Sequence, residues 1–170
     1  MKHSVSGTVR LCLIGLFVES VFSLIWLTQW GTVFGCVPLL WGLMRMRSLH
    51  DGFLSAFWLS VIRLLLIGAG AIPTLHMLLR ESVWSLLISL SLWLVLACMA
   101  DGFWAMRISR GLKRNRAAAA VIPLQLLLGL DTVRASLWML STVGILFVTA
   151  LWYYHRAAGE LDACDDPPMM

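Results

Sequence analysis

Residues 82–106 read SVWSLLISLSLWLVLACMADGFWAM, an apolar run whose only charged residue is Asp101. An α-helix rises about 1.5 Å per residue, so about 20 residues cross the roughly 30 Å hydrocarbon core of a bilayer. The run is long and apolar enough to be a transmembrane helix. It therefore predicts an all-α integral membrane protein.

Three further runs have this character, at residues 9–30, 53–72 and 135–154. Two shorter runs, at 33–44 and 117–130, each contain a proline and could be thin crossings or interfacial segments. Across all 170 residues, 60 % are hydrophobic and 13 % are charged, against about 45–50 % and 25 % in soluble domains. A soluble fold of this size buries too little of its surface to hide so much apolar area.

Lysine and arginine indicate how many of these runs cross, because short loops rich in these residues face the cytoplasm. If both short runs cross, ten bases lie on the cytoplasmic side and two, Arg80 and Arg134, lie on the other. If neither crosses, the loop bases divide eight to four, and the N-terminus falls on the poorer side. The first division favours six transmembrane helices as three hairpins, two of the spans short, with both chain ends in the cytoplasm. A mixed case with one short run crossing stays open.

The ten cytoplasmic bases are Lys2, Arg10, Arg45, Arg47, Arg107, Arg110, Lys113, Arg114, Arg116 and Arg156. Half of them lie in one short loop, so we predict that this loop determines the topology. Its bases are Arg107, Arg110, Lys113, Arg114 and Arg116.

The distribution of apolar and charged residues also indicates the domain limits and the kind of partner. Residues 1–158 are expected to form a single transmembrane domain, and the acidic stretch from residue 159 to 170 a disordered cytoplasmic tail. The bases cluster between apolar runs, which favours orientation in a membrane over a nucleic-acid partner. We expect the lipid bilayer as partner, with a second copy or another membrane protein. The cysteines and histidines lack metal-ligand spacing, so no metal, no cofactor and no catalytic residue is predicted.

The stretch from about residue 59 to 110 follows a recognisable order. An apolar helix leads to a turn containing Ile72 and Pro73, and a second apolar helix ends in ADGF at 100–103 before a basic loop. This order resembles the repeating hairpin of the HdeD-like acid-resistance membrane proteins. The first and last hairpins depart from it by placing Pro38 and Pro123 within a helix. The resemblance implies six spans, a bacterial cytoplasmic (inner) membrane and a stress-linked role without catalysis, and it carries over no site residues.

Two charged residues, Glu19 and Arg63, fall inside predicted spans. Each lies ten residues after the start of its run, which places both about 15 Å deep if both helices run outward from the cytoplasm. An ionisable side chain at that depth costs about 2.5–3.5 kcal/mol to insert, so it is usually paired or faces a cavity. We therefore predict an intramembrane ion pair or solute site here, with Ser23 and Ser60 as supporting polar residues.

These features leave three classes of function. The first is a non-catalytic inner-membrane protein with a stress-related or envelope-related role. The alternative is a small transporter or solute-binding membrane subunit with its site at Glu19 and Arg63. The third is a membrane-embedded transferase, because the string around Asp101 resembles the CDP-alcohol phosphotransferase motif, although that motif's partner aspartates are missing. A water-accessible cavity at Glu19 and Arg63 would favour transport, and a dry, directly paired core would favour the first class.

Overall fold

The computed structural model of the chain describes residues 5–24, 28–70, 72, 81–113 and 116–165. Side chains are described within these ranges except at 22–24, 28–31, 81, 82, 85, 116–118, 129, 131, 132 and 165. The helices are α1 (Val5–Leu24), α2 (Thr28–Met46), α3 (Asp51–Gly70), α5 (Glu81–Ser109), α6 (Arg116–Gly129), α7 (Asp131–Ala135) and α8 (Leu137–Asp165). The described residues contain no strand, and the predicted all-α class is confirmed.

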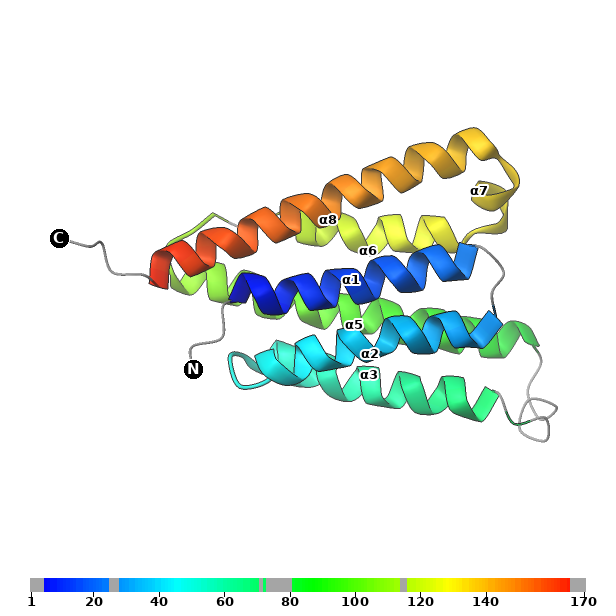
Figure 1. Cartoon of the computed structure of the whole chain (residues 1–170), viewed down its shortest axis with the longest axis horizontal. Coiled ribbons are helices and arrows are strands. Elements are labelled where there is room, and N and C mark those ends of the chain that lie inside the picture. The colour runs from blue at the N-terminus through cyan, green and yellow to red at the C-terminus, as the bar shows by residue number, and fades with distance from the viewer. Residues whose placement is uncertain (1–4, 25–27, 71, 73–80, 114–115, 166–170) are drawn as a thin grey trace.

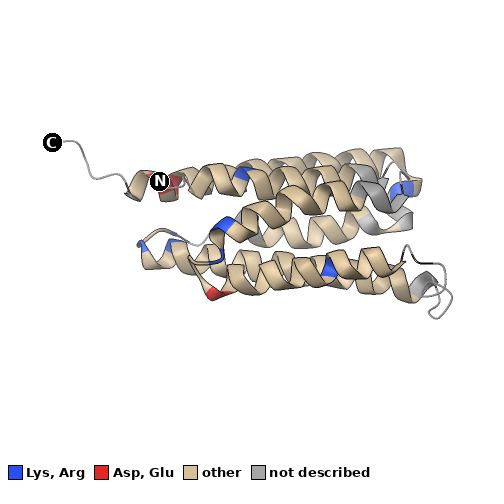
Figure 2. Cartoon of the chain, turned by 60° about the horizontal axis from the view of Figure 1, so that its bottom comes forward, with Lys and Arg blue, Asp and Glu red and all other residues tan. Residues whose placement is uncertain are grey.

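The long helices run alongside one another as an up-and-down bundle (Figure 1). Successive helices pack in pairs, α1 with α2, α3 with α5 and α6 with α8, and further contacts join α2 to α3, α1 to α8 and α5 to α6. The start of α1 and the end of α8 lie at the same end of the bundle (Figure 1). Several of the lysine and arginine residues lie at or near this end (Figure 2). We call it the basic end, and the opposite end, which holds α7, the α7 end.

Three helical segments within the described ranges are long and apolar enough to cross a membrane. They are Asp51–Gly70 in α3, Leu86–Ser109 in α5 and Leu137–Cys164 in α8. Large apolar side chains on these helices face outward, for example Leu65 at 68 % exposed and Trp138 at 86 %. Soluble monomers rarely expose apolar patches on this scale, whereas lipid solvates them. The chain is therefore a helical membrane protein.

The two short apolar runs form helices of different length. α2 has 19 residues and begins at Thr28, so residues 28–30, which the sequence places at the end of the run 9–30, belong to the second helix. α1 ends at Leu24, and the predicted end of the first run at residue 30 and start of the second at residue 33 are therefore wrong. α6 has 14 residues, which corresponds to a length of about 21 Å. Both helices contain their proline, Pro38 in α2 and Pro123 in α6.

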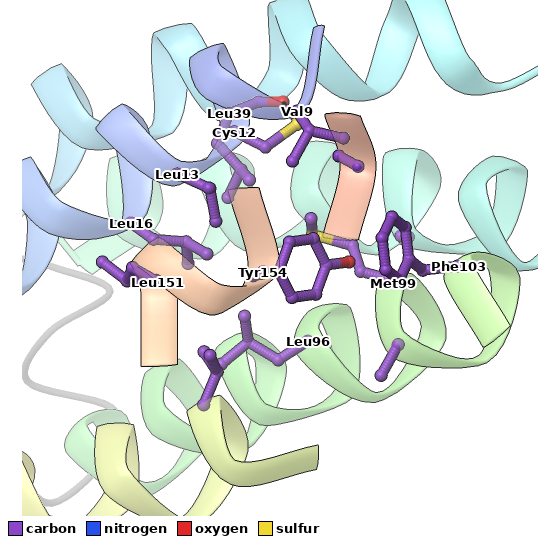
Figure 3. Close-up of a cluster of buried hydrophobic side chains, with 14 of the residues drawn as sticks. Val9, Cys12, Leu13, Leu16, Leu39, Leu96, Met99, Phe103, Leu151 and Tyr154 are labelled. Atoms are coloured by element: carbon purple, nitrogen blue, oxygen red, sulfur yellow. Dashed lines mark hydrogen bonds between the residues drawn. The ribbon is translucent and has the colours of Figure 1, made fainter. Parts of the chain in front are cut away.

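A cluster of buried apolar side chains surrounds Tyr154 of α8 (Figure 3). The Phe103 ring of α5 stacks on the Tyr154 ring, with the centroids 4.5 Å apart and the planes at 22°. Leu16 of α1 is 2 % exposed in the same cluster. Cys12 is fully buried, and its thiol donates to the Leu39 carbonyl of α2 at 3.9 Å. It therefore acts as a small apolar core residue.

Glycines bring two pairs of helices into close contact. A Cβ added to Gly52 of α3 would lie 2.8 Å from the Cys98 carbonyl oxygen and 2.8 Å from the Gly102 nitrogen, both on α5. A Cβ added to Gly35 of α2 would lie 2.6 Å from the Glu19 Cβ of α1. Helices in lipid associate largely through such contacts between small residues. The second contact fixes the position of Glu19 against α2.

The end of α8 corrects the predicted tail. The sequence predicts disorder from residue 159, but the helix continues to Asp165, and Leu161 is fully buried. The expectation of a disordered tail is therefore wrong for residues 159–165. An acidic, weakly apolar stretch gives no sign of this order, because the contacts that stabilise it come from α1 and α5, which are distant in sequence.

Arg107 and Asp162 make several of these contacts. Arg107 of α5 donates from Nη1 to the Ala157 carbonyl (2.8 Å) and from Nη2 to the Glu160 carboxylate (2.9 Å). The Asp162 carboxylate accepts hydrogen bonds from the first two backbone N–H groups of α1, at 2.7 and 2.9 Å. Carboxylates are favourable at helix N-termini because those N–H groups lack intrahelical partners.

The bases predicted to determine the topology therefore differ in environment. Arg107 is only 5 % exposed, so it fastens α8 to α5 as well as carrying charge. Arg110 is half-buried and donates to the Leu161 carbonyl (2.8 Å), whereas Lys113 is exposed. Arg114 lies outside the described residues, and so does the side chain of Arg116.

Candidate functional site

The structure brings Glu19 and Arg63 together inside the bundle. Nη2 of Arg63 on α3 donates to Oε1 of Glu19 on α1, and the two groups form a salt bridge. Both residues are 2 % exposed. The close contact of α1 with α2 at Gly35 and the packing of α2 on α3 set the separation of the two side chains.

Arg63 also binds α5. Its Nη1 donates to the Ile88 carbonyl and to Ser91 Oγ, the latter at 3.2 Å. The guanidinium thus links three helices. Two atoms of the ion pair, Glu19 Oε2 and Arg63 Nε, are buried and have no hydrogen-bond partner among the described residues. A buried polar atom normally has a partner, and an unmade hydrogen bond there costs about 1–3 kcal/mol.

A cavity of about 250 Å³ lies beside this ion pair. Glu19 and Arg63 line it, together with four further polar side chains and an apolar wall from α5 and α6. A single water needs only about 10–15 Å³ measured in this way, so the space is large enough for several waters or a small solute. The other polar side chains are Thr32, Ser89, Gln125 and Arg134.

Gln125 and Arg134 bring α6 and α7 into the site. The Ser20 hydroxyl on α1 donates to Gln125 Oε1 at 2.7 Å, which ties α6 to α1 next to Glu19. Nε of Arg134 donates to the Leu128 carbonyl at 3.3 Å, which directs the guanidinium back from α7 along the end of α6. The cavity therefore extends from the ion pair toward the α7 end.

The charges that line the cavity do not balance. Glu19 and Arg63 neutralise each other, whereas Arg134 forms no salt bridge with any described acidic side chain. The net charge of the described lining is therefore positive by one unit. In a wall otherwise rich in leucine, this charge favours an anionic group, since guanidinium is well matched to carboxylate and phosphate.

Of the two predicted supporting serines, Ser60 does not line the cavity. Ser60 is fully buried, but its hydroxyl donates to the Ala56 carbonyl of its own helix at 2.9 Å and does not line the cavity. Spacing placed Ser60 on the face of Arg63 and could not show that its hydroxyl turns back to the backbone. The side chain of Ser23 lies outside the described residues. No group of three or more potential metal ligands occurs in the described part of the chain.

Sequence reasoning missed the polar residues of the cavity wall. Gln125 interrupts a short apolar run, and this is a signal that could have marked it. Arg134 appeared as one of two bases on the far side, with no sign that it lies near Glu19. Gly35 packs against Glu19 where α1 contacts α2, and nothing in the sequence except its small size indicates this contact.

Comparison with known proteins gives no relative for this arrangement. No family model, no curated protein and no solved structure matches the chain. The resemblance of residues 59–110 to the HdeD-like proteins therefore stays a prediction.

Proposed function

We propose that the chain is a small transporter or solute-binding subunit of a bacterial cytoplasmic membrane, with its solute site at Glu19 and Arg63. The observation that carries the proposal is that this buried ion pair lines a cavity of about 250 Å³. The proposal involves no catalysis. No feature of the described residues favours a stress-related role over solute binding.

The alternative explanation of the pair is purely structural. A buried ion pair adds little net stability unless its remaining polar atoms are hydrogen-bonded. A pair that only fixes helix register would therefore be expected to have all of its polar atoms bonded within the protein. Here Glu19 Oε2 and Arg63 Nε are left without a described partner. Unsatisfied polar atoms beside a cavity with several polar side chains in an otherwise apolar wall are typical of a site that binds water or solute.

The topology that we propose has six crossings, with both chain ends in the cytoplasm. It is supported by the bases near the end where α1 begins and α8 ends (Figure 2) and by the alternating direction of the long helices (Figure 1). In this topology the cavity extends from the middle of the membrane toward the outer side.

Reporter fusions test the topology. Fusions after Ser48, Leu112 and Glu160 are expected to report the cytoplasm, and those after Met77 and Thr132 the outer side. The ten-to-two division of lysine and arginine predicts this result, because short loops rich in these residues stay on the cytoplasmic side. An outward signal after Leu112, in the most basic loop, would refute the proposed topology.

Water access to the cavity tests the function. We would introduce Ser89→Cys, on the cavity wall, into a variant whose native cysteines, Cys12, Cys36, Cys98 and Cys164, are all alanine. The protein is reconstituted in phosphatidylcholine nanodiscs and treated with the anionic thiol reagent 2-sulfonatoethyl methanethiosulfonate. The reagent is membrane-impermeant, so rapid labelling is expected only if the cavity is open to water.

The matched control is Thr149→Cys. Thr149 is exposed on α8 and does not line the cavity, so a thiol there faces lipid and is expected to react slowly. Equal, slow labelling at both positions in folded protein would contradict a solute site and favour a structural ion pair.

A further inference from the structure

We propose that the cavity binds a small zwitterion, with its ammonium group on Glu19 and its anionic group on Arg134. The inference rests on the proposed solute-binding function and names the chemical class of the solute. The same chemistry occurs in free amino acids and in zwitterionic lipid headgroups, and the experiment below separates these sources.

The anionic group follows from Arg134. This residue lines the cavity and is half-buried, and its guanidinium forms no salt bridge with any acidic side chain that the structure describes. Its Nε is used by the Leu128 carbonyl. The two terminal nitrogens have no described partner and can donate to both oxygens of a carboxylate, the geometry that guanidinium favours.

The ammonium group follows from Glu19. One carboxylate oxygen accepts from Arg63, and the other, Oε2, is buried without a described partner. A carboxylate oxygen is an acceptor only, so whatever satisfies Oε2 must donate a hydrogen bond. A purely anionic solute would meet this oxygen with repulsion. An ammonium group would satisfy this oxygen by donating a hydrogen bond to it.

The separation of the two groups sets the length of the solute. Gln125 contacts Ser20, the neighbour of Glu19 in the chain, and the Arg134 guanidinium lies against Leu128. Leu128 follows Gln125 by three residues, a rise of about 4.5 Å along α6. These two points on α6 are therefore about this far apart, and we propose a solute whose charged groups are separated by at least a similar distance. Glycine is too short for this, whereas 4-aminobutyrate in its extended form is long enough.

Protection of the Ser89→Cys thiol from labelling measures occupancy of the cavity. The protein is the full chain in phosphatidylcholine nanodiscs, and the probes are 4-aminobutyrate, glycine, butyrate and butylamine. We expect 4-aminobutyrate to slow labelling at concentrations about tenfold lower than any of the other three, because each of these lacks one charge-assisted contact or the necessary length.

Variants assign the two ends. Arg134→Gln removes the contact to the carboxylate, so 4-aminobutyrate is expected to protect the thiol no better than butylamine does. Glu19→Gln removes the contact to the ammonium group, so 4-aminobutyrate is expected to protect the thiol no better than butyrate does. Lys113→Gln is the matched control, because Lys113 is an exposed base that does not line the cavity, and it is expected to leave the protection by 4-aminobutyrate unchanged. Since Glu19→Gln alters a buried pair, its folding is checked by gel filtration. If it does not fold, Arg134→Gln decides the proposal.

The outcomes separate this inference from the function on which it rests. Rapid labelling of Ser89→Cys without protection by 4-aminobutyrate, or with equal protection by butyrate or butylamine, overturns the zwitterion while the water-accessible site stands. Protection in phosphatidylethanolamine nanodiscs that is lost with Arg134→Gln supports the same chemistry and identifies a lipid headgroup as the source. Slow labelling without any probe refutes the solute site itself.

Discussion

Removing Arg63 is expected to destabilise the protein more than removing Glu19, although each change breaks the same ion pair. Arg63 is the only described hydrogen-bond partner of the Glu19 carboxylate, so Arg63→Met leaves this buried charge without a described protein partner. After Glu19→Gln, in contrast, Arg63 still donates to the Ile88 carbonyl and to Ser91. Breaking a buried pair costs about 3–5 kcal/mol. We expect Arg63→Met near the upper value and Glu19→Gln at or below the lower one.

The assay is a double-mutant cycle, with the free energy of unfolding measured by reversible titration with SDS in mixed micelles. The double variant leaves no unpaired charge, so its loss should be smaller than the sum of the single losses by about 1–3 kcal/mol. Ser60→Ala is the matched control, since Ser60 is buried one turn before Arg63 and bonds only to its own helix. It should cost about 0.5–1.5 kcal/mol and show no coupling to Glu19→Gln. An additive cycle would show that the two side chains are not coupled, and equal losses for the two single variants would contradict the expected difference between them.

Three further changes test the packing around the site. Gly35→Ala should destabilise the protein by about 1–3 kcal/mol, because the new Cβ would lie 2.6 Å from the Glu19 Cβ of α1. Gly68→Ala is the control, and it should be neutral or stabilising because a Cβ at Gly68 would have nothing within 4 Å. SDS titration measures the free energy of unfolding of both variants. Arg107→Gln should release the end of α8, which amide hydrogen exchange over residues 157–165 would detect as lost protection, while Lys113→Gln should leave that protection unchanged. Tyr154→Phe should cost less than about 1 kcal/mol or stabilise, because the Tyr154 hydroxyl is buried without a described partner; a loss above 2 kcal/mol would mean that the hydroxyl does form a hydrogen bond.

The ion pair could be predicted from sequence because charge is costly in lipid. Glu19 and Arg63 stand out in apolar runs, and the fixed rise of a helix allows their depths to be compared. The apolar runs themselves gave the positions of α3, α5 and α8 for the same reason, since a hydrophobic segment of sufficient length has few alternatives in a membrane protein.

The cavity could not be predicted in this way. Whether Gln125 and Arg134 face the space beside Glu19 depends on the rotation of α6 and on the return of the chain through α7. Those are set by packing between helices distant in sequence, and a short apolar run such as 117–130 does not specify its own rotation. The order of residues 159–165 escaped prediction for a similar reason, because it depends on Arg107 and on the start of α1.

The most direct test of the central claim is to locate ordered solvent around Glu19 in the protein reconstituted in lipid nanodiscs. We predict a water molecule or a bound solute within hydrogen-bond distance of Glu19 Oε2, in a space that also reaches Arg134. Side chains or lipid tails that fill this space, with both carboxylate oxygens of Glu19 bonded to Arg63, would contradict the claim that the ion pair is a solute site.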